Sequence, residues 1–204
     1  YLRQILRTCE RAGLTGRLVE VRADAPEAMV VDAIRALGTD PAVAGIIVQM
    51  PLPPGVRMRP VVEAIDPAKD IDGIHPLNAG LLRLGYDGFR PATAHATLEI
   101  LKRSGIEIAG REAVVVGRST VVGMPAAFML VQEDATVTVC HSRTRDLRRH
   151  LRRAEIVVVA AGRPGLVTGN MLRRGAVVVD VGINVIDGRL VGDVDFASAA
   201  RVAS

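Results

Sequence analysis

The sequence predicts an α/β protein built on a parallel sheet, and two observations carry this prediction. In the second half of the chain, short apolar runs rich in valine and isoleucine alternate with helical stretches. At residues 112–131 a β-branched run, a loop with glycines and an apolar helix follow one another. Such runs suit strands buried on both faces, and strands that alternate with helices form parallel sheets covered on both faces. The 204 residues leave room for one or two domains.

The first part of the chain predicts a smaller α/β unit. Its expected elements are helices over 1–12, 25–37 and 61–65 and strands over 17–22 and 43–48. Prolines within 51–54 cannot continue a sheet, so Gln49 is expected at the carboxyl end of a strand, where α/β proteins bind ligands. Residues 66–82 are dense in Asp, Gly, Pro and Asn, which predicts a surface loop or a binding loop.

From residue 96 on, the alternation of strands and helices is regular. The expected strands span 113–116, 136–140, 156–160, 176–181 and 189–191, and the expected helices span 97–103, 124–131, 145–153 and 170–173. We therefore expect two domains, over residues 1–95 and 96–204.

Composition argues against several classes of function. Hydrophobic residues make up 49% and charged residues 24%, as in globular proteins. Aromatic residues make up only 2%, too few for base stacking, and the net charge of +4 is modest, so no nucleic-acid partner is expected. The distant Cys9 and Cys140 argue against a disulfide scaffold or a zinc site. No apolar run is long enough for a membrane span and no signal peptide is visible, so a cytoplasmic protein is expected. Because the sequence starts at Tyr1 without Met, we expect its N-terminus to be incomplete.

The loop after residues 113–116 indicates a nucleotide site. Gly117 ends the strand, Gly123 follows, and Pro125 opens an apolar helix. This geometry points backbone N–H groups and the helix dipole at a phosphate. The spacing is not GxGxxG, so an ordinary turn between a strand and a helix stays an alternative.

The tip of the next strand selects the cofactor in dinucleotide-binding folds. A carboxylate there binds the ribose of NAD, whereas an arginine accepts the 2′-phosphate of NADP. The tip carries Ser142, Arg143 and Arg145, with no carboxylate before Asp146. Arg118 adds a third cation from the glycine loop. This pattern favours NADP, and a solvated basic loop is the alternative.

Asp70 and Asp72 form an acidic pair in the loop at 66–82. A Ca²⁺ site needs more oxygen ligands at set spacings, so no metal is expected. The two carboxylates could accept hydrogen bonds from a heterocycle, or they could cap the loop. His75 and His141 also lie in expected loops, and neither has a partnered nucleophile.

These motifs resemble, nearly end to end, those of the bifunctional methylenetetrahydrofolate dehydrogenase/cyclohydrolase family. The similar segments are its Tyr-x-x-x-Lys helix at 1–10, VQLPLP at 48–53, KDVDGFHPxNxGxL at 69–82, GRSxxVGxP at 117–125, TVTxCHSxT at 136–144, GAVVIDVGIN at 175–184 and LVGDVDF at 190–196. The resemblance implies a three-layer α/β catalytic domain and a Rossmann-like NADP-binding domain that flank a cleft. It also implies a homodimer formed through the nucleotide domain.

The resemblance implies roles for single residues. Tyr1 would stack on the aminobenzoyl ring of a tetrahydrofolate substrate, Gln49 would contact the reacting centre, and Asp72 would bind the pterin. On the cofactor side, Ile183 would meet the nicotinamide. The residues expected to hold NADP are Gly117, Arg118, Ser119, Gly123, Ser142 and Arg143.

The sequence departs from the family pattern in four places. Ile5 stands at the position of the catalytic lysine, and the PCTPxG segment is altered over 91–96. Met124 replaces a basic or polar residue, and the sequence stops at Ser204, before the family's PGGVGPMT segment. We therefore expect NADP-dependent oxidation of 5,10-methylenetetrahydrofolate with the cyclohydrolase activity weakened or lost, unless another residue such as His95 supplies the proton. The alternatives are a non-catalytic folate or nucleotide binder and an unrelated NADP dehydrogenase.

Overall fold

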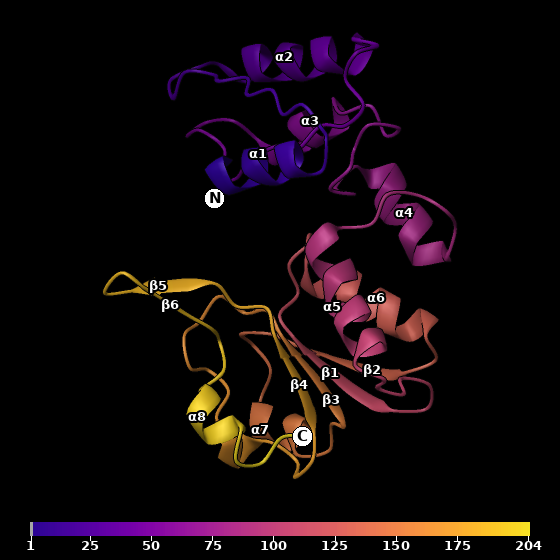
Figure 1. The fold of residues 1–204 in the computed structure, drawn as a ribbon, viewed down its shortest axis with the longest axis vertical. Coiled ribbons are helices and arrows are strands. Elements are labelled where there is room, and N and C mark those ends of the chain that lie inside the picture. The colour runs from indigo at the N-terminus through magenta and orange to yellow at the C-terminus, as the bar shows by residue number, and fades with distance from the viewer. Residues whose placement is uncertain (1) are drawn as a thin grey trace.

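The computed structural model describes residues 2–204, so the role expected of Tyr1 lies outside the described residues. The chain forms two parts (Figure 1). Helices α1 (Leu2–Arg11), α2 (Glu27–Thr39) and α3 (Met58–Glu63) lie at one end of the molecule, and a sheet with its covering helices lies at the other. Helices α4 (Pro76–Leu84) and α5 (Ala92–Arg103) follow between them in the chain.

The second part is built on a four-stranded parallel sheet in the order β2-β1-β3-β4. Its strands are β1 (Glu112–Val116), β2 (Thr136–Cys140), β3 (Ile156–Val159) and β4 (Val177–Asp180). In the register, Val115 lies beside Val139 on one side and Val158 on the other. All four residues of β3 are buried, as a strand in the middle of a covered sheet requires. The parallel sheet expected from the alternating pattern is confirmed.

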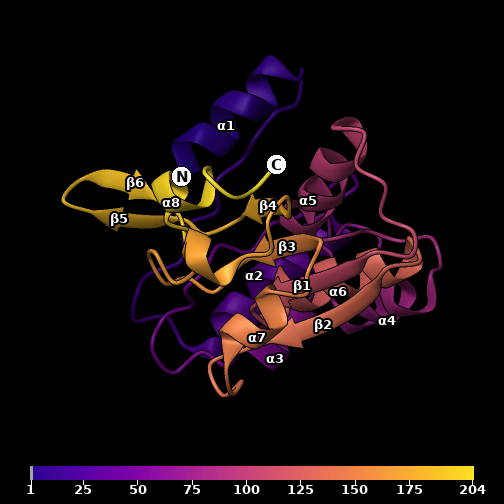
Figure 2. The same ribbon diagram turned by 90° about the horizontal axis from the view of Figure 1, so that it is seen from below.

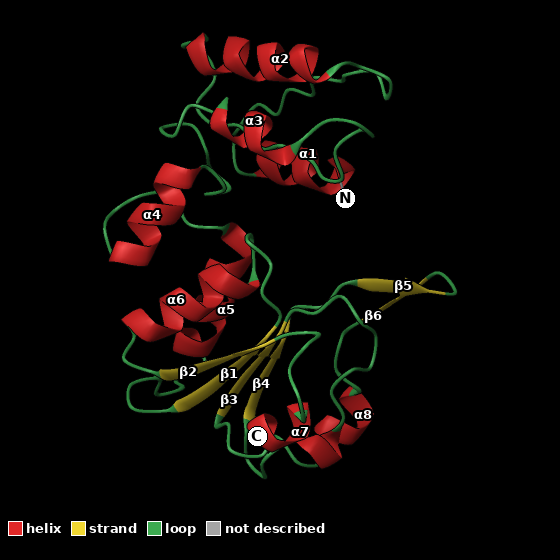
Figure 3. Cartoon of the chain, turned by 180° about the vertical axis from the view of Figure 1, so that it is seen from behind, coloured by secondary structure: helices red, strands yellow, loops and turns green. Residues whose placement is uncertain are grey.

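Helices cover both faces of this sheet (Figure 3). Val115 and Val158 pack on one face in a core with α5 and α6 (Gly123–Gln132). Val114 and Val157 pack on the other face, where α7 (Leu147–Leu151), the 3-10 helix η1 (Gly169–Met171) and α8 (Phe196–Ala199) lie. Successive side chains of a strand point to opposite faces, which divides the valines in this way. Leu82 of α4 joins the first of these cores.

The first part has a smaller core and no regular sheet within residues 2–90. Val31 and Ile34 of α2 pack with Val61 of α3 and with Ile46. The strand expected over 43–48 is reduced to one parallel bridge, between Ile46 and Asp70. The segment 17–22 is largely exposed and is not a strand either. Both strand predictions are wrong for the same reason, because an apolar run becomes a strand only where a neighbouring segment completes a ladder of hydrogen bonds.

Two further elements differ from expectation. Helix α4 begins inside the predicted loop at 66–82 and runs past its end. The imidazole Nδ1 of His75 accepts the N–H of Leu77 at 3.0 Å, and Gly85 ends the helix at a φ of 74°. The expected last strand exists as β6 (Arg189–Val191), but it pairs with β5 (Asn184–Ile186) in an antiparallel hairpin apart from the sheet. Figure 1 shows this hairpin projecting from one side of the molecule.

Within residues 2–204, no helix has the length and apolar character that a membrane span needs.

Candidate nucleotide and substrate site

The glycine loop lies where the carboxyl ends of β1, β2 and β3 meet. Gly117 has a φ of 129°, and a Cβ added there would lie 2.1 Å from the carbonyl oxygen of Ala160, just after β3. A Cβ on Gly123 would lie 2.4 Å from the carbonyl oxygen of Gly117. The N–H of Gly117 donates to the carbonyl of Cys140 at 2.8 Å. Both positions therefore need glycine, which gives the close backbone approach that nucleotide loops use.

Ser119 turns its hydroxyl toward the start of α6. Its Oγ accepts the N–H of Val122 at 3.2 Å and the N–H of Gly123 at 3.1 Å. Two N–H groups of the kind expected to face a phosphate are thus satisfied within the protein. Ser119 shapes the start of the helix, and the exposed Arg118 beside it carries the positive charge of the loop.

The turn after β2 is held by its own side chains. Thr144 Oγ1 accepts the N–H of His141 at 2.8 Å, and His141 Nδ1 accepts the N–H of Arg143 at 3.1 Å. Ser142 and Arg143 are exposed at the tip of this turn. The next carboxylate, on Asp146, accepts a backbone N–H of α7 and caps that helix. The tip therefore presents a cation and a hydroxyl, with the nearest carboxylate in sequence engaged elsewhere.

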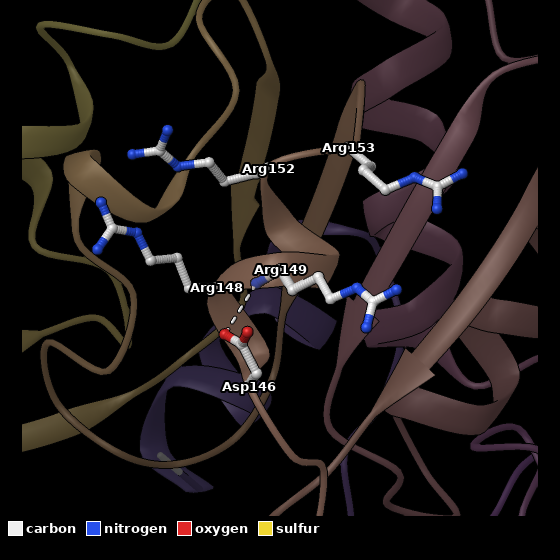
Figure 4. Close-up of a pocket in the computed structure, with 5 residues that line it drawn as sticks. All are labelled: Asp146, Arg148, Arg149, Arg152 and Arg153. Atoms are coloured by element: carbon white, nitrogen blue, oxygen red, sulfur yellow. Dashed lines mark hydrogen bonds between the residues drawn. The ribbon is translucent and has the colours of Figure 1, made fainter.

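A shallow hollow of about 440 Å³ lies on α7, which follows this turn. Figure 4 shows Arg148 and Arg152 extending to one side and Arg149 and Arg153 to the other. Asp146 lies between the two pairs. Within residues 2–204, none of the four arginines forms an ion pair with a carboxylate. The hollow adds positive charge to this side of the domain, and its one carboxylate among the lining residues, Asp146, is engaged in capping α7.

The expected cofactor residues lie along one edge of the sheet. The strand order places the tip of β2 next to the glycine loop of β1, followed by the ends of β3 and β4. Ile183 follows β4 with 74% of its surface exposed, at the base of the hairpin. Parallel α/β sheets bind ligands at the carboxyl ends of their strands. The structure therefore brings Gly117, Arg143 and Ile183 to the edge where a dinucleotide would lie.

In the first part, Asp70 is the residue that caps the loop. It is fully buried and accepts the N–H of Ile74 at 3.1 Å, the N–H of His75 at 2.8 Å and the side-chain amide of Asn78 at 2.8 Å. The sequence left capping and ligand binding open for the acidic pair. The structure assigns the capping role to Asp70.

Asp72 has a different environment. It is half-buried, and no residue within 2–204 donates a hydrogen bond to its carboxylate. Burial, and secondly the negative charge of Asp70, raise the pKa of the Asp72 carboxyl. The parallel bridge at Ile46 and Asp70 directs Gln49 and Asp72 to the same end of the paired segments. A partly desolvated acceptor with no donor of its own suits a heterocycle that carries N–H groups.

Helix α1 carries Ile5, which is half-buried. The helix lies on the side of the first part that faces the β5–β6 hairpin (Figures 1 and 2). His95, the other proton donor considered from the sequence, is exposed on α5 with its Nε2 3.9 Å from Glu99 Oε1.

Two residues near the edge of the sheet that carries the expected cofactor residues were missed by the sequence analysis, Asp180 and Asp193. Their roles depend on backbone N–H groups that converge on them, and no local sequence signal reveals such convergence.

A parallel sheet with a glycine loop and an arginine-bearing strand tip defines a dinucleotide-binding α/β protein. Comparison with known families is more specific. Residues 91–204 match the NAD(P)-binding domain of tetrahydrofolate dehydrogenase/cyclohydrolase, and residues 1–72 match the catalytic domain. The chain belongs to the tetrahydrofolate dehydrogenase/cyclohydrolase family, whose members are enzymes.

Individual relatives agree with this assignment. The bifunctional protein FolD of Azoarcus sp. (strain BH72) is 50% identical over 208 residues, which cover 100% of this chain and 72% of that protein. The FolD structure from Campylobacter jejuni matches with a TM-score of 0.98 and 38% identity, over 100% of this chain and 73% of that one. The Trypanosoma brucei enzyme, complexed with NADP cofactor and an inhibitor, matches with a TM-score of 0.94 and 38% identity, over 100% and 72%. The family and fold class expected from the sequence are confirmed.

Proposed function

We propose that this protein oxidises 5,10-methylenetetrahydrofolate with NADP, and that its hydrolysis of the methenyl product is weakened or lost. The cofactor assignment rests on the glycine loop and the strand tip next to it. A Cβ added at Gly117 or Gly123 would collide with backbone atoms, and the neighbouring tip exposes Arg143 and has no carboxylate before Asp146. The NADP complex of the Trypanosoma brucei relative supports it. The domain over 1–95 would hold the folate and the domain over 96–204 the cofactor.

NADP supplies the hydride acceptor when it is bound. Arg118, Ser142 and Arg143 would hold its 2′-phosphate, and Gly117 and Gly123 would give its pyrophosphate access to the backbone. Ser119 would contribute through the loop that it shapes, and Ile183 would meet the nicotinamide. One charge-assisted contact to phosphate contributes roughly 1.5–3 kcal/mol, so NADP should bind at least about tenfold more tightly than NAD.

The folate would bind to the exposed end of the bridged segments in the first domain. The Asp72 carboxylate would accept N–H groups of the pterin, and the Gln49 amide would contact the reacting centre. Tyr1 would stack on the aminobenzoyl ring. The role of Asp72 is supported by its carboxylate, to which no residue within 2–204 donates, and that of Gln49 by the bridge at Ile46 and Asp70, which directs both residues to the same end of the paired segments.

An isoleucine at position 5 should affect the hydrolysis more than the oxidation, because the two reactions have different chemical needs. Hydride leaves the bridging methylene carbon with the help of the neighbouring nitrogen lone pair, and no proton is removed from that carbon. Hydrolysis needs more, because water must lose a proton as it attacks and a ring nitrogen must gain one. A positioned acid or base contributes roughly 10²–10⁴-fold to such a step. The hydrocarbon side chain of Ile5 offers no proton and no acceptor.

Two assays on the purified protein test this proposal. Dehydrogenase activity is measured from NADPH formation with methylenetetrahydrofolate, with NAD in a parallel series, and cyclohydrolase activity from the decay of methenyltetrahydrofolate. We expect a dehydrogenase that prefers NADP and a cyclohydrolase near background. Ile5→Lys should raise the cyclohydrolase more than the dehydrogenase, whereas Leu2→Lys on the same helix should not. A wild-type cyclohydrolase as fast as its dehydrogenase would refute the role given to Ile5.

A non-catalytic binder of folate and NADP is the second candidate. The altered segment 91–96 favours it, because this segment starts α5 and lies next to the Asp70–Asp72 loop: a Cβ on Gly73 would meet the Pro91 nitrogen at 2.9 Å. Absence of both activities together with binding of both ligands would support this candidate. A homodimer and a cytoplasmic location stay predictions, to be tested by sedimentation and by cell fractionation.

A further inference from the structure

A buried carboxylate connects two segments of the cofactor edge. Asp193 is fully buried. Its Oδ2 accepts the N–H of Ala161 at 2.6 Å and of Gly162 at 2.7 Å. Its Oδ1 accepts the N–H of Arg163 at 2.7 Å and the side-chain amide of Asn184 at 2.8 Å. Three consecutive N–H groups after β3 and one amide at the start of the hairpin therefore converge on one side chain.

A second aspartate fixes the position of the first. The carboxylate of Asp180, at the end of β4, accepts the N–H of Asp193 at 3.0 Å and the N–H of Val194 at 2.9 Å. A Cβ on Gly192 would lie 1.9 Å from Asp180 Oδ2, and a Cβ on Gly182 would lie 2.3 Å from the Asp193 carboxyl carbon. Both glycines are thus required by the carboxylates packed against them.

The two segments that Asp193 holds, residues 161–163 and the turn at Asn184, both border the proposed cofactor site. Ala160, which precedes the three N–H donors, is the residue whose carbonyl touches the glycine loop at Gly117. Asn184 directly follows Ile183. In this sheet order the tip of β2 would receive the 2′-phosphate side and the loop after β1 the pyrophosphate, which leaves the ends of β3 and β4 to the nicotinamide half.

We propose that Asp193 is a positioning residue for the nicotinamide half of the cofactor. It holds residues 161–163 and the turn at Ile183 and Asn184 in one arrangement, and it acts through them without contacting NADP itself. This inference rests on the proposed function, since it assumes that the edge binds NADP. It separates the cofactor site into a half that depends on Asp193 and a half, at Arg143, that does not.

The chemistry of the four hydrogen bonds explains why a carboxylate is needed. All four partners are donors, and a carboxylate is an acceptor at both oxygens. In Asp193→Asn the amide nitrogen faces one of the two donor pairs, so two buried donors lose their acceptor. The loop after β3 or the turn at Asn184 must then move.

Calorimetric titration with two probes tests the proposal without relying on activity. The probes are NADP and adenosine 2′,5′-bisphosphate, which carries the adenine half and the 2′-phosphate but no nicotinamide. In Asp193→Asn, NADP should bind at least about tenfold more weakly, while the bisphosphate should bind within about twofold of wild type. Asp70→Asn is the matched control, a fully buried aspartate with three donors in the other domain, and it should change neither affinity.

The outcomes separate the possible failures. Equal weakening of both probes in Asp193→Asn, or unchanged NADP affinity, would overturn the positioning role. If the wild-type protein binds neither probe, the proposed function itself fails. If Asp193→Asn does not fold, Asn184→Ala decides the matter. It keeps the three backbone partners of Asp193 and releases only the turn, where Asn184 also donates to the Val191 carbonyl, so it should weaken NADP about threefold and spare the bisphosphate. An equal loss of affinity for both probes, or no loss for NADP, would contradict the proposal.

Discussion

The two parts of the molecule each hold one fully buried aspartate next to a candidate site, but they support it differently. Asp193 lies at the carboxyl edge of a four-stranded sheet whose central residues, such as Val115 and Val158, are fully buried. Asp70 lies in a part that has one isolated bridge, at Ile46. The cofactor edge is therefore fixed by backbone ladders and core packing, and its carboxylate adjusts the loops. The loop around Asp70 and Asp72 depends on the Asp70 carboxylate itself, because Asp70 supplies the hydrogen bonds that a sheet would otherwise provide.

Comparison of two glycines would test the rigidity of the cofactor edge and should give the largest effect. Gly117→Ala combines a φ of 129° with a contact of 2.1 Å to a backbone oxygen. It should lower the free energy of unfolding by about 3 kcal/mol or more and abolish NADP binding. Gly110→Ala is the control, with a φ of 75° but no atom within 4 Å, and it should lose only about 1–2 kcal/mol. Urea denaturation measures the free energy of unfolding of both variants. Similar losses would show that the loop backbone can shift to accommodate a side chain.

Asp72→Ala sharpens the comparison on the folate side. Loss of the acceptor leaves pterin donors unpaired, so folate should bind about 1–3 kcal/mol more weakly while NADP binding is unchanged. Since burial raises the pKa of Asp72 and the pterin donors favour its carboxylate form, folate affinity of the wild type should rise with pH through that pKa. The variant should lose this rise. Asp87→Ala, at an exposed turn, is the control, and equal weakening of both ligands in Asp72→Ala would reduce Asp72 to a structural residue.

The smallest expected effect is an acid dependence confined to the first part. Hydrogen bonds from the Arg57 side chain, and then from its backbone N–H, lower the pKa of Glu27 from 4.5 to about 2. A lowered pKa means that the stabilisation is fully present above the unfolded-state value and is lost as pH falls from 4.5 toward about 2. Glu27→Gln should flatten the unfolding free energy over this window relative to wild type. Glu10→Gln, exposed on α1, should leave the pH dependence unchanged, and a flat wild-type profile would contradict the prediction.

The sequence predicted the second part well because several apolar runs of the same composition follow one another there, so each run has neighbours that complete its ladder. Val114 and Val157 lie in unbroken apolar runs that are buried on both faces, and burial of that kind leaves a local signal. In the first part, Val43–Val48 has the same composition, but whether it becomes a strand depends on a partner elsewhere in the chain. Helix α4 was missed because Asn78 and Gly80 are poor helix formers, and Asn78 is there for its bond to Asp70.

The candidate site divides in the same way. Gly117 and Arg143 could be proposed from the sequence because short motifs carry their chemistry. The hairpin had a usable signal in Asp187 and Gly188, whose φ angles of 49° and 73° are those of a two-residue turn. Asp193 had none, because its partners at 161–163 lie 30 to 32 positions away in the chain. Residues whose function is to gather distant N–H groups are visible only after folding.

The contact between Gly117 and Ala160 limits how this protein can be engineered. A change of cofactor preference cannot be sought in the two loop glycines, because any added side-chain atom collides with backbone rather than with a movable side chain. Ser142 and Arg143 are exposed at a turn that His141 and Thr144 hold together without them. A library that randomises only these two exposed positions could be screened for variants that prefer NAD or NADP, and it would leave the rest of the turn intact.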